Sequence, residues 1–194
     1  MKKWWASLIL VSVVFLAGCQ MIDNLFLDIR EEVTGISGTI QTYDEESRII
    51  DQIKGKSVAF SANNEFADEY GNGSVLDVTV SGKQVTHVGS TLLFYEDGLT
   101  NIFDEFAEKV DIETMDRAVP LVNRMVNEFK NTYFGTDKVI LIRSQSGNPL
   151  ATFVGDNVSI TSMEVDKMTK ITIDGKRIYI YRADYTIYDT SLLQ

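Results

Sequence analysis

The sequence predicts an α+β fold, mainly antiparallel β, with two duplicated β-rich halves of about six strands each joined by an amphipathic helix. Three observations lead to this prediction. From Gly35 onward, short apolar or alternating segments are separated by turn residues at close intervals. One segment in the middle of the chain has the apolar spacing of a helix. The strand pattern that precedes this segment recurs after it.

Residues 1–18 are set aside before the fold is considered, because they have the pattern of an export signal. Lys2 and Lys3 form a basic start, residues 4–17 are almost entirely apolar, and Leu-Ala-Gly leads into Cys19, the only cysteine. The apolar run is shorter than the roughly 20 residues that a transmembrane helix needs. The pattern resembles the lipobox of bacterial lipoproteins, in which the cysteine thiol receives a diacylglycerol and the chain is cut just before it. A plain signal peptide is the alternative.

The charge of the chain disfavours one class of partner. The full chain of 194 residues has a net charge of -10, with 18 basic and 28 acidic side chains. Loss of residues 1–18 removes two lysines and leaves 16 basic side chains against 28, a net charge of -12. Nucleic-acid binding needs a basic surface, so we expect no nucleic-acid partner. An acidic domain is repelled by anionic lipids, so the two acyl chains on Cys19 would supply the membrane anchor.

Residues 19–34 are predicted to be the lipid-anchored cysteine and a short amphipathic segment. The apolar residues of Gln20–Val33 follow a helical stripe. This helix either docks on the domain or lies at the membrane interface. We favour docking, because interfacial helices are usually rich in Lys and Arg and this one has a single arginine, Arg30.

The first β-rich repeat, 35–97, holds six predicted strands. They are Thr39–Tyr43, Arg48–Lys54, Ser57–Ser61, Val75–Val80, Gln84–Val88 and Thr91–Glu96. The helical connection, 98–135, starts with apolar residues at helical spacing, namely Ile102, Phe103, Phe106 and Val110. Its second part, 116–133, is the predicted amphipathic helix, with Val119, Val122, Val126, Phe129 and Tyr133 on one face.

The second β-rich repeat, 136–194, matches the first without gaps in two blocks. Gly38–Ser61 aligns with Lys138–Thr161 at an offset of 100, and Val78–Val85 aligns with Ile171–Ile178 at an offset of 93. The change of offset falls in a polar loop, where insertions are tolerated. We interpret this correspondence as an internal duplication.

Four segments resemble a family of small uncharacterised lipoproteins of Gram-positive bacteria, a domain of unknown function. They are Ile40–Asp44, Gly82–Thr91, Val122–Asn127 and Ile173–Lys176. The resemblance spans nearly the whole mature chain and implies a Gram-positive membrane location. It implies no activity and no site residue.

Few residues suggest chemistry, and we expect no catalytic residue, metal ligand or cofactor. His87 is the only histidine, has no cysteine or second histidine to work with, and is interpreted as structural. The loop Asp68–Gly73 departs from the calcium-binding pattern because Tyr70 replaces an oxygen ligand. Asn123 and Asn127 share one side of the predicted helix, where a helix-to-sheet polar contact is the favoured interpretation.

A candidate partner surface lies on the C-terminal strands. Alternation places Tyr179 and Tyr181 on one face of a strand, opposite isoleucines that form the natural core face. Outward tyrosines beside Arg182 and near Tyr185 could hold an envelope protein, a peptide or a glycan. The alternative is that the tyrosines only stabilise the sheet.

The predicted function is therefore a membrane-anchored extracytoplasmic lipoprotein that acts as a non-enzymatic envelope binding or interaction module. Two alternatives are an enzyme, such as a hydrolase, with an unrecognised site, and a small solute-binding lipoprotein of a transporter.

Overall fold

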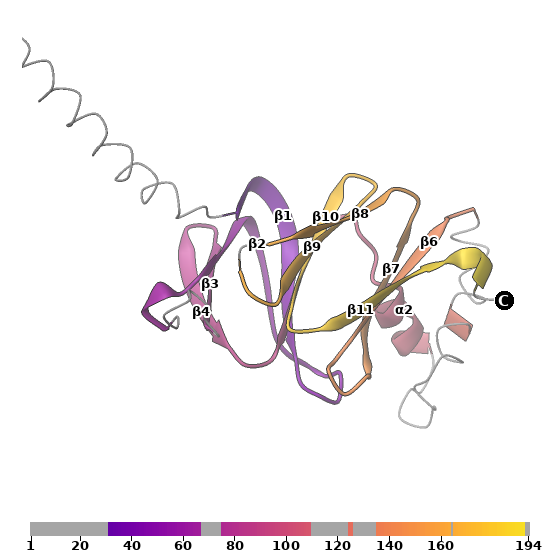
Figure 1. Ribbon diagram of the computed structural model, residues 1–194, viewed down its shortest axis with the longest axis horizontal. Coiled ribbons are helices and arrows are strands. Elements are labelled where there is room, and N and C mark those ends of the chain that lie inside the picture. The colour runs from indigo at the N-terminus through magenta and orange to yellow at the C-terminus, as the bar shows by residue number, and fades with distance from the viewer. Residues whose placement is uncertain (1–30, 67–74, 110–123, 126–134, 164, 193–194) are drawn as a thin grey trace, which may run out of the picture.

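The computed structural model describes residues 31–66, 75–109, 124–125, 135–163 and 165–192, and these form a nearly all-β molecule (Figure 1). The strands are β1 (Glu31–Tyr43), β2 (Ile49–Ala62), β3 (Val75–Val80), β4 (Lys83–Val88), β5 (Thr91–Glu96), β6 (Lys138–Arg143), β7 (Pro149–Gly155), β8 (Val158–Ser162), β9 (Met168–Ile173), β10 (Lys176–Tyr181) and β11 (Asp184–Asp189). Among the described residues, the helical elements are α2 (Ile102–Lys109), the two helical residues Arg124 and Met125, and two 3-10 turns, Asn64–Phe66 and Thr190–Leu192.

The strands form two antiparallel sheets. The larger sheet has eight strands in the order β4-β3-β2-β1-β5-β10-β9-β8, and the smaller has three in the order β11-β6-β7. We call β1–β5 the first half of the molecule and β6–β11 the second half. Figure 1 shows β3 and β4 at one end, with β6, β7 and α2 toward the other.

The predicted α+β class is wrong. The two halves are not separate six-stranded units joined by a helix, because strands of both halves share the eight-stranded sheet. α2 is one short helix of eight residues, and it packs on β7. Of the predicted amphipathic helix 116–133, Arg124 and Met125 are described, and the rest lies outside the described residues. Among the described residues, strands in two antiparallel sheets predominate, which makes the molecule nearly all-β rather than α+β.

α2 is fixed at its start by an asparagine. The Asn101 side-chain oxygen accepts a hydrogen bond from the Phe103 backbone N–H at 3.2 Å, as an N-cap does. The same oxygen accepts from the Thr152 backbone N–H on β7 at 2.9 Å. The buried apolar face of the helix, Ile102, Phe103 and Phe106, then covers β7.

Two predicted boundaries are also wrong. Residues 31–33, which the sequence assigned to the helix Gln20–Val33, belong to strand β1, and residues 20–30 lie outside the described residues. The two predicted strands on either side of Gly55 are one long strand, β2. Its N-terminal part pairs with β1, and its C-terminal part, Val58–Ala62, also pairs with β3.

The pair β5–β10 forms a wall between two hydrophobic cores. Leu92 and Phe94 of β5 face the first core together with Tyr179 and Tyr181 of β10. The residues between them face the second core: Leu93, Ile178 and Ile180. Both faces of the wall are therefore buried, and alternation along each strand sends neighbouring side chains into different cores.

The two cores have different compositions. The first contains an aromatic trio in which Tyr179 lies 5.0 Å from Phe60 and 5.7 Å from Phe94, measured between ring centroids. The second is mainly aliphatic, and its fully buried members include Ile140, Ile142, Leu150, Phe153, Ile171 and Ile173.

Strand registers correspond between the halves. Val58 pairs with Val80 across β2–β3, and Val158 pairs with Ile173 across β8–β9. Likewise Gly38 pairs with Glu96, and Lys138 pairs with Asp189. Positions 38–61 thus correspond to 138–161 at an offset of 100, and positions 75–96 correspond to 168–189 at an offset of 93. Backbone conformation follows the same offsets, since the positive φ angles of 51° at Ser81 and 76° at Gly82 recur as 49° at Asp174 and 82° at Gly175.

β2 needs a glycine at position 55, where Val80 of β3 comes close to its backbone. A Cβ at Gly55 would collide with Val80, and a Cβ at the corresponding Gly155 would collide with the corresponding Ile173. The residue that follows each collision partner forms hydrogen bonds with the backbone just after the glycine. The Ser81 hydroxyl binds the Lys56 backbone at 3.0–3.1 Å, and the Asp174 carboxylate accepts from the Asn157 backbone N–H at 2.8 Å. These backbone donors hold the pKa of Asp174 below its usual value.

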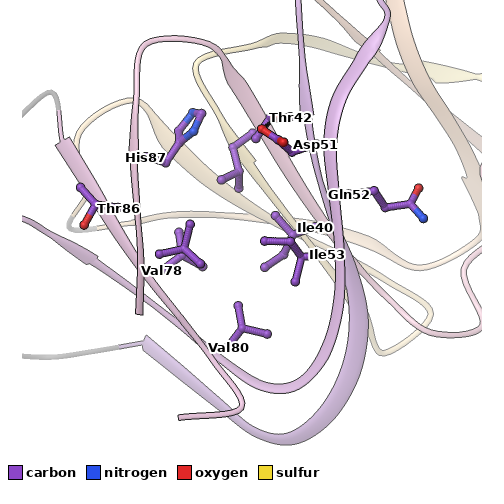
Figure 2. Close-up of a pocket in the computed structure, with 11 residues that line it drawn as sticks. Ile40, Thr42, Asp51, Gln52, Ile53, Val78, Val80, Thr86 and His87 are labelled. Atoms are coloured by element: carbon purple, nitrogen blue, oxygen red, sulfur yellow. Dashed lines mark hydrogen bonds between the residues drawn. The ribbon is translucent and has the colours of Figure 1, made fainter. Parts of the chain in front are cut away.

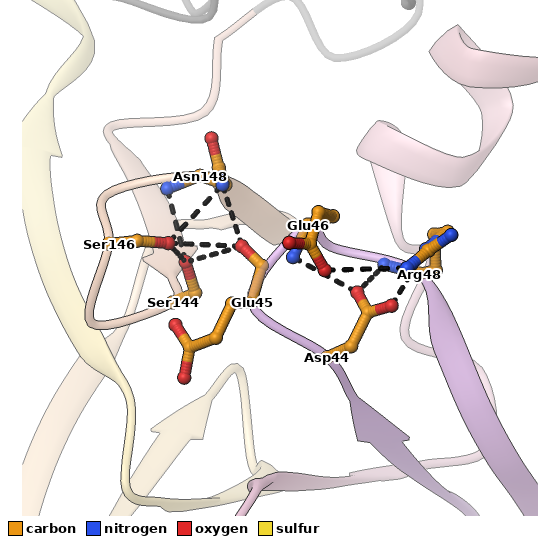
Figure 3. Close-up of polar contacts among 7 residues, drawn as sticks. All are labelled: Asp44, Glu45, Glu46, Arg48, Ser144, Ser146 and Asn148. Atoms are coloured by element: carbon orange, nitrogen blue, oxygen red, sulfur yellow. Dashed lines mark hydrogen bonds and ion pairs between the residues drawn. The ribbon is translucent and has the colours of Figure 1, made fainter.

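Corresponding turns of the halves contact each other (Figure 3). The backbone carbonyl of Glu45, in the β1–β2 turn, accepts from Asn148 Nδ2 at 2.6 Å and from Ser146 Oγ at 3.0 Å, both in the β6–β7 turn. Arg48 closes its own turn through Asp44 at 2.7 Å. This contact ties the β6–β7 turn of the smaller sheet to the turn between two inner strands of the larger one.

We expect Gly55→Ala to lower the free energy of unfolding by about 1–3 kcal/mol, because the new methyl group collides with Val80. Val80→Ala in the same chain removes the colliding atoms, so the double variant should lose less than the sum of the single variants. Urea unfolding of the four proteins measures this coupling. Gly82→Ala is the control, since its cost comes from a φ of 76° and Val80→Ala should not relieve it. Strict additivity at Gly55 would contradict the collision.

Candidate functional site

A cavity of about 310 Å³ lies inside the first half, between β1, β2, β3, β4 and β5. Its lining residues are Ile40, Thr42, Asp51, Gln52, Ile53, Val78, Val80, Val85, Thr86, His87 and Leu92. Figure 2 shows His87 on one side and Thr42 with Asp51 on the other, and Ile40, Ile53, Val78 and Val80 between and below them. The volume falls at the lower end of the range for small-molecule sites.

The floor of the cavity is apolar and belongs to the first core. Ile40, Val78, Val80 and Leu92 are all buried there. Polar groups gather at the rim, where Asp51 is exposed and His87 is half-buried. An apolar body could therefore be buried below while polar groups at the rim fix its orientation.

Hydrogen bonds within the protein already occupy the donors of the rim side chains. Thr42 Oγ1 donates to Asp51 Oδ2 at 3.3 Å. Thr86 Oγ1 donates to Asp77 Oδ1 at 2.9 Å, but this pair lies on the other face of β3 and β4 from His87 and Leu76. His87 Nε2 lies 2.7 Å from the Ser90 carbonyl oxygen, which can only accept, so Nε2 carries the hydrogen. The His87 ring also packs edge-on against Tyr181 of the wall, at 6.0 Å between centroids.

Gln52 belongs to the opposite face of the sheet. It pairs with Gln41, whereas Asp51 pairs with Thr42, and alternate residues of a strand point to opposite faces. Its side-chain oxygen accepts from Gln41 Nε2 at 2.9 Å, and Gln41 in turn accepts from the Tyr43 hydroxyl at 2.6 Å. Figure 2 shows the Gln52 amide turned away from His87 and Asp51. Burial, with a smaller effect of Asp104, raises the pKa of Tyr43, so this hydroxyl stays a neutral donor.

The same positions of the second half are filled with apolar side chains. By the register correspondence, Thr42 becomes Ile142 and His87 becomes Ile180. The other corresponding pairs include Asp51 and Ala151, Ile53 and Phe153, Val78 and Ile171, Val80 and Ile173, and Val85 and Ile178. All seven counterparts are buried in the second core. The common backbone thus carries a packed core in one half and a polar-rimmed cavity in the other.

The predicted partner surface on β10 is wrong. Tyr179 and Tyr181 are each 1% exposed, because both faces of the wall are covered by a core. The isoleucines do form a core face, but the tyrosines face the other core. Tyr185 lies on β11, packed against the second core, and Arg182 lies in the β10–β11 turn with a φ of 55°.

His87 is the one predicted polar residue that the structure places at the cavity. The sequence interpretation of a structural role agrees with its bond to the Ser90 carbonyl, but it missed the cavity. Asp51 and Thr42 were missed altogether, because a lone carboxylate on a strand has no motif. A signal was present in the repeat alignment, where these polar residues align with alanine and isoleucine.

Several predicted features lie outside the described residues: Cys19, the loop Asp68–Gly73, Asn123 and Asn127. Within the described part of the chain, no helix has the length and apolarity to cross a membrane. The same part contains no group of three or more His, Cys, Asp or Glu side chains placed to hold a metal ion.

The chain belongs to the family described as domain of unknown function DUF5052, which matches residues 2–193. No curated protein and no solved structure matches the chain. The predicted resemblance to an uncharacterised family is thus confirmed at the level of the family.

Because the two halves are packed differently, we expect opposite substitutions at corresponding positions to have different effects on the free energy of unfolding. Thr42→Ile places an apolar side chain into open space, so we expect the free energy of unfolding to stay unchanged or rise by up to about 1 kcal/mol. The reverse change at the corresponding position, Ile142→Thr, should lower it by about 1–3 kcal/mol, because it leaves a hydroxyl and a gap in a packed core. Urea unfolding compares the two, and equal losses would mean that the first half has no usable space.

Proposed function

We propose that the protein is a lipid-anchored module on the outer face of a Gram-positive cell membrane, and that it binds a small molecule in the cavity of its first half. The observation that carries the binding part is the contrast between the halves. The same strand registers bury isoleucine at positions 142 and 180 of the second half, and leave Thr42 and His87 around about 310 Å³ of space in the first. Filling such a space would stabilise the fold, so an open, polar-rimmed one is readily explained by a ligand.

The cavity favours a small ligand over a docked macromolecule. The tyrosines that would have held a protein, peptide or glycan are buried. The cavity lies among five strands and has an apolar floor, which suits a compact molecule. A small solute-binding lipoprotein is therefore favoured over an interaction surface on the sheet.

The rim is built to hold a ligand rather than to transfer protons. A general base works on a proton within hydrogen-bond reach. The His87 N–H is held by the Ser90 carbonyl, and the Thr42 hydroxyl is held by Asp51. This arrangement supports a non-enzymatic role.

The anchor part is supported by the sequence Leu-Ala-Gly-Cys after an apolar segment. A diacylglyceryl group supplies two acyl chains, which is enough for stable membrane attachment of an acidic domain.

Binding should depend on the open space of the first half. Screening a small-molecule library by thermal shift and by native mass spectrometry should find ligands that raise the melting temperature of the wild-type protein. The variant Thr42→Ile, His87→Ile carries the second half's residues and should lose these shifts while it remains folded. Thr161→Ile, an exposed position on β8, is the matched control and should keep them. Ligands that shift all three proteins equally would contradict binding in the cavity.

Attachment should depend on Cys19. In the native bacterium, Cys19→Ser should either release the protein from the membrane fraction or leave it as an uncut precursor, because no thiol is left to receive the lipid. Fractionation and mass spectrometry of the N-terminal peptide measure both results. Gln20→Ser, at the neighbouring position, should remain attached. Normal processing and membrane retention of the Cys19→Ser protein would contradict the anchor.

A further inference from the structure

We propose that the cavity takes a small organic amine, held as its ammonium ion by Asp51 above an apolar floor. This inference rests on the proposed function and names the chemical class of its ligand. It follows from counting which hydrogen-bonding groups of the rim remain for a ligand.

The hydrogen-bond donors of the rim side chains are already bonded to other groups of the protein. The hydroxyl hydrogen of Thr42 points to Asp51, and the His87 N–H points to the Ser90 carbonyl. Thr86 lies on the other face of β4, where it pairs with Asp77. The amide of Gln52 lies on the other face of β2. These side chains can therefore only accept hydrogen bonds from a ligand.

The rim groups that remain for a ligand are acceptors, and the Asp51 carboxylate is the strongest of them. The Asp51 carboxylate keeps lone pairs beyond the single bond from Thr42, at 3.3 Å. The hydroxyl oxygen of Thr42 can accept, and so can Nδ1 of His87 when Nε2 carries the hydrogen. An ammonium group has only donors, so it matches this set, whereas a carboxylate or phosphate has only acceptors and would leave the rim unpaired.

Charge favours the same ligand class. Among the described residues that line the cavity, Asp51 is the only acidic side chain, and none is a lysine or arginine. Across the part of the chain that the structure describes, no ion pair is recorded for Asp51. The whole chain carries a net charge of -10, which would attract a cation before contact. An anionic ligand would be repelled by Asp51 at the cavity and by the net charge of the chain at longer distance.

The apolar floor of the cavity determines what kind of body the amine can be attached to. Ile40, Val78, Val80 and Leu92 are buried aliphatic side chains with no polar atom beyond the backbone. They can cover a compact aliphatic or aromatic body that carries the amine at one end. A polyhydroxylated ligand such as a sugar would bury its hydroxyl groups without partners on this floor.

Three probes that share one body test the ligand class: phenethylammonium, 2-phenylethanol and phenylacetate. Isothermal titration calorimetry on the protein without its export signal, residues 19–194, should rank the ammonium first, the alcohol at least tenfold weaker, and the carboxylate weakest or unbound. Asp51→Asn should remove the preference of the ammonium over the alcohol and leave the affinity for the alcohol within about twofold. Asp166→Asn, at an exposed site, is the control and should keep the wild-type ranking.

The outcomes separate the two proposals. If phenylacetate binds as well as the ammonium or better, and the Thr42→Ile, His87→Ile variant abolishes that binding, the amine is overturned and the cavity stands. If the three probes bind wild type and that variant alike, or if none binds and the library screen also finds no cavity-dependent ligand, both proposals are overturned. Loss of ammonium binding in Asp51→Asn without loss of alcohol binding supports the amine, because a merely structural aspartate would affect both probes.

Discussion

The pairing of β5 with β10 is the contact on which the rest of the structure depends. Four consecutive residue pairs, from Ile178 with Tyr95 to Tyr181 with Leu92, join the two halves into one eight-stranded sheet. Since side chains alternate, the pair faces a core on each side, and neither core is complete without it. The end of the pair is fastened by Lys176, whose Nζ donates to the Asp97 carbonyl at 2.6 Å, and by the Arg177 backbone N–H, which donates to Glu96 at 3.1 Å. The cavity depends on the pair too, because Leu92 lines it and Tyr181 supports the His87 ring.

The two halves show which features of the fold are fixed and which are free to differ. The glycine at position 55 or 155, the tight turn at 81–82 or 174–175 and the strand registers are shared, because each is set by backbone geometry that admits few residues. The side chains inside each half are not constrained in this way. A core tolerates many apolar sets of suitable volume, so one half could pack fully with isoleucine while the other kept a threonine, an aspartate and a histidine around a space.

The strands of the first half and the repeat offsets could be predicted from the sequence, because alternation, turn glycines and short-range register are local properties. The fold class could not, because the sharing of one sheet by both halves depends on the pairing of β5 with β10, which lie about 80 residues apart. The tyrosines of β10 show the same limit. A strand with isoleucine on one face and tyrosine on the other looks half-exposed, and only the second core reveals that both faces are covered. The cavity left a trace only in the differences between aligned halves.

The order in which the strands are made has a consequence for how the chain reaches this structure. Every partner strand of β1–β4 lies within the first half, so those pairings can form as soon as residue 96 has left the ribosome. β5 is different, because one of its edges waits for β10 while about 80 further residues are synthesised. During that interval Leu93 and the edge of β5 have no cover, which is the state in which β-sheet chains join one another. A translation product that stops after the first half would therefore tend to aggregate, although most of its own strand pairs are in place.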